Sequence, residues 1–186
     1  AEVLQYIADG IRMKSAEADA MYAGIVIDTN NFTNQTGVRT FEAAAFLRRN
    51  GADVTRVRKL FRDDMQDYKA RAAAISSAEI YREAFSIGVC PSEGLPSPTI
   101  VCAQAANELL EIKGIKASVV MTEYHGLIYL SARSIDEVNV QVMMEKLGGG
   151  GHRTIAGAQL SGISMEEAKD RVKAVIDEML QKGDIS

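Results

Sequence analysis

Residues 84–186 alternate between short apolar runs and longer amphipathic stretches, and this alternation constrains the fold more than any other feature of the sequence. Short runs rich in β-branched and aromatic residues are typical of strands, whereas apolar positions three and four residues apart are typical of helices. The resulting order of strands and helices predicts a mixed-sheet α/β domain. The expected strands cover residues 85–90, 116–124, 127–131 and 156–160, and the expected helices cover residues 99–112, 134–147 and 164 onward.

The residues before this domain have helical patterns. Small or apolar side chains recur at three- and four-residue spacing after Ser15, and the polar residues that follow Asp28 are expected to end that helix. Thr40 is a suitable N-cap for a helix that ends before Gly51, and another helix is expected over residues 55–61. The predicted organisation is a helical segment, a connecting helix and the α/β domain, over residues 1–62, 63–83 and 84–186.

Short local signals indicate where elements of the α/β domain begin. Ser134 and Ser164 are each followed three residues later by a glutamate, which is the spacing of a capping box at the start of a helix. His125 and Gly126 separate two expected strands and predict a tight turn between them. We therefore interpret His125 as a surface residue.

The composition limits the classes of function. The 186 residues carry a formal net charge of −4 and have a pI near 5.3. This balance argues against a basic surface that wraps a long nucleic acid, but not against a site for a small anion. Apolar runs stay well below the roughly 20 residues that cross a bilayer, so we expect no membrane contact from this segment. Cys90 and Cys102 are expected to be small buried thiols in a reducing compartment.

Four consecutive glycines, Gly148, Gly149, Gly150 and Gly151, directly precede His152. Residues without a Cβ let a ligand approach the backbone, and several main-chain N–H groups together can hold an anion. The imidazole would add a side-chain donor to such a site. The alternative is a flexible connection between a helix and a strand. The segment is not a P-loop, because no Lys-Ser or Lys-Thr follows at the required spacing.

Arg133 lies at the carboxyl end of an expected strand, where open α/β sheets tend to bind their ligands. A guanidinium can contact two phosphate oxygens at once and keeps its charge, which makes Arg133 a candidate phosphate contact. The alternative is an exposed arginine at a strand end. Asn139 and Gln141 follow on the first turn of the next expected helix. They could read the edge of a base or simply be solvated.

Asp28 ends an apolar stretch and precedes an asparagine-rich one. A carboxylate in this place could bind a metal ion, or it could be an ordinary helix-terminal aspartate. Arg39 could pair with Asp28 or face solvent. The sequence has two histidines and lacks His-x-x-x-His, Cys-x-x-Cys and Asp-x-Asp motifs, so a self-contained zinc site has almost no candidate ligands.

Taken together, these features resemble the DHH superfamily of phosphoesterases. The stretches that resemble the end of a DHH domain are residues 23–29, Phe32 and residues 39–44. Residues 131–152, which end in the glycine-histidine motif, resemble the DHH-associated domain. Within the superfamily, residues 105–110 and the Asn-Val-Gln at residues 139–141 are most similar to the membrane-anchored, multi-domain cyclic di-AMP phosphodiesterases. The resemblance covers nearly the whole chain.

The resemblance implies an activity and roles for the candidate residues. The intact parent would hydrolyse cyclic di-AMP to linear pApA with two Mn²⁺ ions, which activate a water and stabilise the charge on the phosphate. Asp28 would be a catalytic residue and a metal ligand. The four glycines, His152 and Arg133 would hold the substrate, with Ser131 and Asn139 beside them.

The earlier metal motifs of the family, an Asp-x-Asp and the Asp-His-His that names it, do not occur in this sequence. Residues 2–7 also resemble the interior of a helix with no cap before them, so we expect the parent protein to continue upstream. The chain would then be a C-terminal, nucleotide-binding half that is inactive alone. We expect it to form a homodimer and to lie on the cytoplasmic face of a parent anchored in the cell membrane.

Two other functions are compatible with the same residues. One is a nuclease for very short oligonucleotides that also acts as a 3′-phosphoadenosine phosphatase, which belongs to the same superfamily. The other is a binding module without catalysis, in which the glycine-histidine segment senses a nucleotide.

Overall fold

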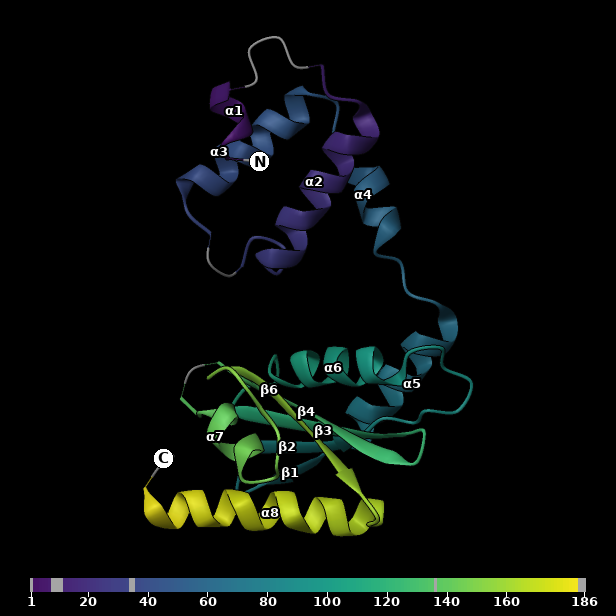
Figure 1. The fold of residues 1–186 in the computed structure, drawn as a ribbon, viewed down its shortest axis with the longest axis vertical. Helices are drawn as coiled ribbons and strands as arrows, with labels where there is room; N and C mark the ends of the chain where they lie inside the picture. Colours follow the sequence, from purple (N-terminus) through teal and green to yellow (C-terminus); the bar gives the residue numbers. More distant parts are fainter. Residues whose placement is uncertain (1, 8–11, 34–35, 136, 184–186) are drawn as a thin grey trace. The chain divides into compact units, whose positions relative to one another are not determined.

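The computed structural model describes residues 2–7, 12–33, 36–135 and 137–183. The chain divides into two compact units, Ala1–Asp63 and Asp64–Ser186, each of which is described by itself (Figure 1). The first unit is helical, and the second contains a six-stranded mixed sheet with helices on both faces. The α/β class predicted from the alternating pattern is therefore confirmed.

The first unit consists of short helices around a small apolar core that includes Leu47. Its helices are α1 (Leu4–Ile7), α2 (Ser15–Asp28), α3 (Val38–Arg49) and α4 (Val54–Leu60). Asp19 links α2 to α4, because its buried carboxylate accepts hydrogen bonds from the Asp53 N–H (2.7 Å) and from Arg56 Nε (2.6 Å). These bonds hold the pKa of Asp19 below its ordinary value, the bond from Arg56 contributing most.

Helix α2 ends at Asp28, as predicted, but α3 begins earlier than expected. Gly37 rather than Thr40 occupies the N-cap position, so the helix starts at Val38. Thr40 still supports this helix end, since its hydroxyl accepts a hydrogen bond from the Gly37 N–H (3.4 Å). Thr40, which was predicted to be the N-cap, is thus part of the first turn of α3.

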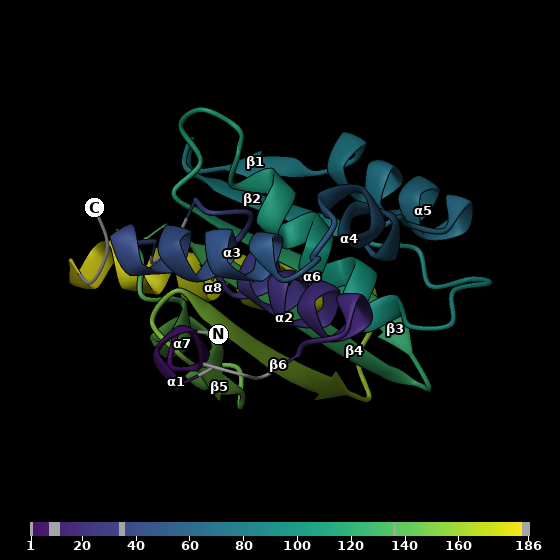
Figure 2. The ribbon, with the colours of Figure 1, turned by 90° about the horizontal axis from the view of Figure 1, so that it is seen from above.

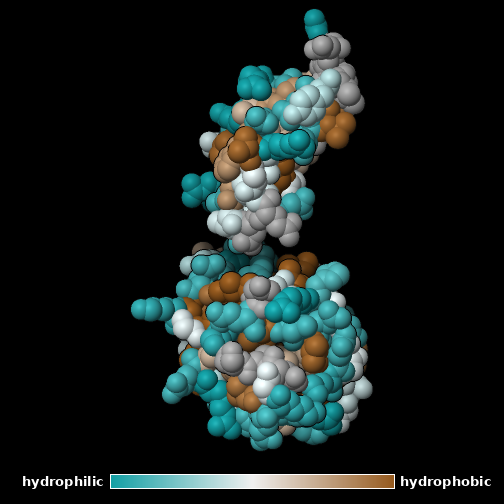
Figure 3. All heavy atoms as spheres, turned by 90° about the vertical axis from the view of Figure 1, so that its left-hand side faces the viewer, coloured by the Kyte–Doolittle hydropathy of each residue, from teal (hydrophilic) through white to brown (hydrophobic). Residues whose placement is uncertain are grey.

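Large apolar side chains remain exposed on the first unit, among them Ile27, Val38, Phe41 and Leu60. Figure 3 shows hydrophobic side chains, in brown, at the surface of this unit between hydrophilic ones, in teal. Single exposed apolar side chains are normal at protein surfaces, and only a contiguous apolar patch indicates a contact surface.

The connecting helix expected over residues 63–83 is shorter in the structure. Helix α5 covers Met65–Ser76, and Glu79–Tyr81 form strand β1, which is antiparallel to β2 (Phe85–Val89). Two alanines of α5 pack into the same apolar cluster as α6, so this helix is part of the second unit. The helical pattern continues past α5 in the sequence, and only the pairing with β2 makes the last residues a strand.

The sheet of the second unit has the strand order β1-β2-β3-β4-β6-β5. Strands β2 and β3 are parallel, and the other neighbouring strands are antiparallel. His125 and Gly126 form the turn between β3 and β4, both with positive φ, as a two-residue hairpin turn requires. The remaining strands are β3 (Ala117–Tyr124), β4 (Leu127–Ser134), β5 (Gly150–Gly151) and β6 (Ile155–Ser161). Strand β4 extends beyond the expected residues 127–131, and β5 was not predicted.

Helices cover both faces of this sheet. Helices α5 and α6 (Pro98–Leu109) lie side by side on one face, as Figures 1 and 2 show. Helices α7 (Val140–Glu145) and α8 (Met165–Lys182) pack against the apolar side chains of the opposite face. The Ser164 hydroxyl accepts a hydrogen bond from the Glu167 N–H (3.2 Å), which confirms the predicted start of α8. Each described helix is too short or too polar to cross a membrane.

The two cysteines lie in the core between the sheet and helices α5 and α6, as expected for small buried thiols. Burial raises the pKa of the Cys90 thiol to about 11 and that of the Cys102 thiol to about 12. The Cys102 thiol also donates to the Val120 carbonyl (3.1 Å). Both side chains are therefore protonated, packed groups at neutral pH.

Candidate functional site

The four consecutive glycines lie between α7 and β6, and two of them complete the end of the helix. The Gly148 N–H donates to the Glu145 carbonyl (3.0 Å), and the Gly149 N–H donates to the Met144 carbonyl (2.8 Å). Both bonds satisfy carbonyl groups that the last turn of α7 leaves without a partner. These two N–H groups are therefore not available to hold an anion.

The other two glycines form β5, the edge strand of the sheet. Gly150 lies opposite Gly157 of β6, and beyond this pair the His152 N–H donates to the Ile155 carbonyl (2.7 Å). Hydrogen-bonded and non-bonded pairs alternate along an antiparallel ladder, so Gly150 faces β6 and the Gly151 N–H points away from it. The expected cradle of several glycine N–H groups is thus corrected to one outward N–H, that of Gly151.

Close packing of the backbone explains why glycine is needed at two of these positions. A Cβ on Gly149 would collide with the Gly157 carbonyl oxygen and lie 2.6 Å from Ala158 Cα. A Cβ on Gly151 would lie 2.5 Å from Ala156 Cα, and this glycine also has a φ of +149°. The segment is therefore a tightly packed edge of the sheet rather than the flexible connection considered as the alternative.

Arg133 is the next-to-last residue of β4, and its side chain lies on the side of the sheet that α6 covers. Its Nε donates to Asn107 Oδ1 of α6 (2.9 Å), and a terminal nitrogen donates to the Ala132 carbonyl (2.9 Å). Partial burial lowers the pKa of Arg133, yet a guanidinium stays charged at neutral pH. Within the described residues no carboxylate pairs with it. Among these residues its positive charge therefore has no acidic partner.

The register of the strands places Arg133 opposite Ile155 of β6, the strand next to the glycine edge. Ser131 shares a face of β4 with Arg133 and lies opposite Gly157, which in turn lies opposite Gly150. Because neighbouring strands are about 4.8 Å apart, Ser131 and Gly150 are about 10 Å apart across β6. His152 follows β5 and is exposed. The structure thus places the predicted arginine and serine on β4 and the glycines and histidine at the nearby sheet edge, with β6 between them.

Asn139 has a structural role that the sequence reading did not identify. It is the N-cap of α7, where its Oδ1 accepts hydrogen bonds from the Gln141 N–H (3.1 Å) and from the N–H that follows (3.4 Å). The helix expected to start at Ser134 does not start there, because Ser134 ends β4 and its hydroxyl donates to the Val138 carbonyl (2.6 Å). Gln141 donates to Glu145 (2.8 Å). Asn139 and Gln141, the two candidates for reading a base edge, thus both lie at the start of α7. The side-chain oxygen of Asn139 is already occupied by hydrogen bonds from the helix.

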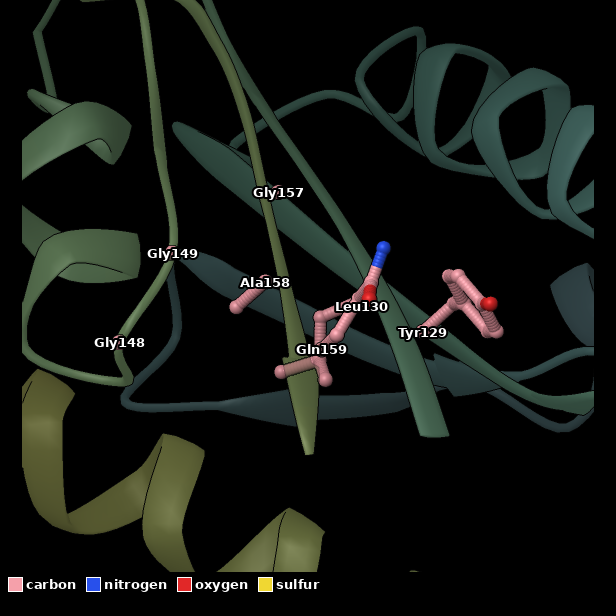
Figure 4. A pocket seen from close by; sticks show the side chains of 7 residues that line it. All are labelled: Tyr129, Leu130, Gly148, Gly149, Gly157, Ala158 and Gln159. Atoms are coloured by element: carbon pink, nitrogen blue, oxygen red, sulfur yellow. The ribbon is translucent and has the colours of Figure 1, made fainter. Parts of the chain in front are cut away.

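An open pocket of about 530 Å³ lies beside the glycine segment, as Figure 4 shows. Its lining consists of Tyr129, Leu130, Gly148, Gly149, Gly157, Ala158 and Gln159. Tyr129 of β4 lies opposite Gln159 of β6, and the two side chains extend to the same side of the sheet (Figure 4). An aromatic ring can stack on a base, and a glutamine amide can both donate to and accept from a base edge. The volume is in the range of small-molecule sites.

Asp28 belongs to the first unit and is exposed at the end of α2. Arg39 does not pair with it, since its guanidinium pairs with Glu2 (3.1 Å). Residues 30–32 all have positive φ, between 44° and 65°, and the hydroxyl of Thr29 accepts a hydrogen bond from the last of their N–H groups (2.9 Å). This left-handed turn fixes the direction in which the chain leaves Asp28.

The described residues do not form a metal site by themselves. Among the residues that the structure describes, no three His, Cys, Asp or Glu side chains converge on one point. Asp28 can supply one carboxylate, whereas a site for two Mn²⁺ ions needs several such ligands. The described side chains therefore do not fit a two-metal centre by themselves.

Sequence reasoning missed Asn107, Tyr129 and Gln159. The period-two pattern of a longer β4 would have placed Tyr129 on one face with Ser131 and Arg133, so this signal was available. The contact of Asn107 with Arg133 joins residues 26 positions apart, and local patterns carry no signal for it.

The fold and the site together define a helical unit and an α/β domain, in which an arginine that pairs with no described carboxylate shares a sheet with a glycine-rich edge strand. Residues 97–182 match the DHHA1 domain family. These residues of the second unit therefore carry a DHHA1 domain.

Known relatives extend this likeness to the whole chain. It is 41% identical over 183 residues to the cyclic-di-AMP phosphodiesterase GdpP of Geobacillus thermodenitrificans, covering 98% of this chain and 28% of that protein. It is also 41% identical over 177 residues to the cyclic-di-AMP phosphodiesterase PdeA of Listeria monocytogenes, covering 95% of this chain and 27% of that protein. The chain thus spans little more than a quarter of these relatives.

A solved structure shares the fold. The exopolyphosphatase-related protein from Bacteroides fragilis superposes with a TM-score of 0.79 at 21% identity, covering 89% of this chain and 51% of that protein. At this level of identity the likeness concerns the fold.

Proposed function

We propose that this chain is the nucleotide-binding part of a cyclic di-AMP phosphodiesterase, which hydrolyses the cyclic dinucleotide to linear pApA. The observation that carries the proposal is the partly buried guanidinium of Arg133, which no carboxylate among the described residues neutralises and whose strand is separated from the glycine edge only by β6. The identity of 41% to GdpP over nearly the whole chain supports the choice of substrate.

In this proposal the second unit holds a phosphate and a base. Arg133 contacts phosphate oxygens with the N–H groups that its neighbours leave free, and the outward Gly151 N–H and the His152 imidazole add donors at the same edge. The adenine enters the pocket between Tyr129 and Gln159, where it stacks on the ring and bonds to the amide. Small glycines at this edge let the nucleotide approach the backbone.

Asp28 has a separate role in this proposal. In a longer protein that contains this chain, Asp28 would be one ligand of a centre with two Mn²⁺ ions, whose other ligands would come from residues outside this sequence. Bound there, the metal would supply an activated water and charge stabilisation. The chain alone would bind nucleotide without cleaving it. The first unit, which exposes several apolar side chains, would contact either the rest of a membrane-anchored parent or a second copy in a homodimer.

Calorimetric titration of this chain tests the binding function. In the presence of a chelator, cyclic di-AMP is expected to bind, and a long RNA is expected to bind no better than a short oligonucleotide because the chain is acidic overall. Affinity is expected to fall as salt is raised, since the contact with the phosphate is ionic. Absence of binding to any adenine dinucleotide would contradict the proposal. A clear preference for linear pApA over the cyclic form would favour the oligonucleotide nuclease instead.

The role of Asp28 is tested in a longer protein that contains this chain. An Asp28→Asn variant is expected to lose Mn²⁺-dependent hydrolysis of cyclic di-AMP by at least about 100-fold, because a metal ligand loses its charge. Its metal-free affinity for the dinucleotide should stay unchanged. Glu42→Gln, which changes an exposed carboxylate of the same unit, serves as the matched control and should retain full activity. Full activity of Asp28→Asn would remove Asp28 from the metal site.

A further inference from the structure

The guanidinium of Arg133 is oriented by neutral groups. Asn107 Oδ1 accepts from Nε, and the Ala132 carbonyl accepts from one terminal nitrogen, both at 2.9 Å. A partly buried arginine is more commonly paired with a carboxylate, because its charge is costly to remove from water without a counter-charge. Here an amide oxygen takes the place where an aspartate of the same shape would form an ion pair.

The neighbouring carboxylate on α6 is directed elsewhere. Glu108, the residue after Asn107, pairs with Arg71 of α5 at 2.5 Å. Arg71 also donates to Gln104 (3.0 Å), one turn earlier on α6. Glu108, the acidic residue next to Asn107 in sequence, is therefore paired with Arg71 and not with Arg133.

Helix α6 is held against the sheet at the residue that precedes Asn107. The Ser118 hydroxyl of β3 donates to the carbonyl of Ala106, the residue before Asn107, at 2.6 Å, and this contact is buried. The helix and strands β3 and β4 thus form one packed body. The position of the Asn107 amide relative to Arg133 is consequently set by the core and does not depend on a flexible loop.

We propose that Asn107 is a positioning residue that aims the Arg133 guanidinium at the phosphate of a nucleotide while leaving its charge free. This inference rests on the proposed function, in which Arg133 contacts the phosphate. An amide at position 107, in place of a carboxylate, then lets the site attract an anion. An aspartate would orient the arginine equally well but would neutralise its positive charge.

The test compares Asn107→Asp with Asn107→Ala by calorimetric titration of the chain with cyclic di-AMP in the presence of a chelator. Asn107→Ala loses one orienting bond, and we expect its affinity to fall about 5-fold. Asn107→Asp keeps the bond but adds a competing negative charge, and we expect a fall of about 30-fold or more. A purely structural role would give the opposite order, since aspartate preserves the shape and the hydrogen bond. Asn107 is exposed, so both variants are expected to fold, which thermal melting checks.

Two controls separate this inference from the proposed function. Glu108→Gln removes a carboxylate at the adjacent position without touching Arg133, and its affinity should stay within about 2-fold of the parent chain. Arg133→Ala reports on the function itself: unchanged affinity in that variant would overturn the nucleotide site. If Arg133→Ala loses affinity but Asn107→Asp binds as well as Asn107→Ala or better, the positioning role of Asn107 is wrong and the site remains.

Discussion

A Gly149→Ala variant is expected to lose at least about 2 kcal/mol of unfolding free energy in the second unit, because the added methyl group collides with backbone atoms. The Gly157 carbonyl oxygen and Ala158 Cα lie where the Cβ would be, and backbone cannot move aside as a flexible side chain can. Relief would require β5 to separate from β6. Urea unfolding followed by circular dichroism measures the loss.

The adjacent glycine provides the matched control for this prediction. A Cβ on Gly150 meets nothing within 4 Å, and its φ lies outside the left-handed region. A Gly150→Ala variant should therefore stay within about 1 kcal/mol of the parent chain, since alanine costs little at an open strand position. Equal unfolding midpoints for the two variants would mean that β5 is not packed against β6 as described.

Arg133→Ala is expected to weaken binding of cyclic di-AMP about 100-fold, because a charge-assisted, paired contact with phosphate is among the strongest single hydrogen-bonding interactions. Arg133→Lys should recover part of this loss, to within about 10-fold of the parent, since lysine restores the charge but not the planar pair of donors. Calorimetric titration in the presence of a chelator measures both values.

An arginine outside the site tests whether this effect is local. Arg39 of the first unit is exposed and pairs with Glu2, so Arg39→Ala removes the same charge from the chain without changing the glycine edge. Its affinity for the dinucleotide should match that of the parent chain. A loss of the same size in both arginine variants would show that net charge, and not the position of Arg133, governs binding.

The glycine segment illustrates how a correctly located motif can have a different physical role. The four glycines were expected to gather their N–H groups around an anion, yet Gly148 and Gly149 cap α7 and Gly150 faces β6. Their main contribution is to let two backbone segments approach closely. The anion site then depends on the side chain of Arg133 and on the residues at the end of this edge.

Errors in the predicted elements have one common cause. The helix expected over residues 63–83 ended early because Glu79–Tyr81 pair with β2, and this pairing involves residues that follow in the chain. Asn139 was considered a possible base contact or a solvated residue, and its role as the N-cap was not predicted because the start of α7 was expected at Ser134. In each case the structure depends on a contact or a helix boundary that the local sequence pattern does not reveal.

The amino-acid pattern alone was enough to infer the class of the fold, most of its strands and helices, the buried thiols and the DHH-associated domain. Hydrophobic periodicity, capping residues and motifs are properties of neighbouring residues. Strand register and packing decided the rest. They placed Arg133 beside the glycine edge, gave it an amide of α6 in place of a carboxylate, and turned most of the glycine N–H groups inward. These features depend on contacts between residues far apart in the chain, whose energies no local pattern records.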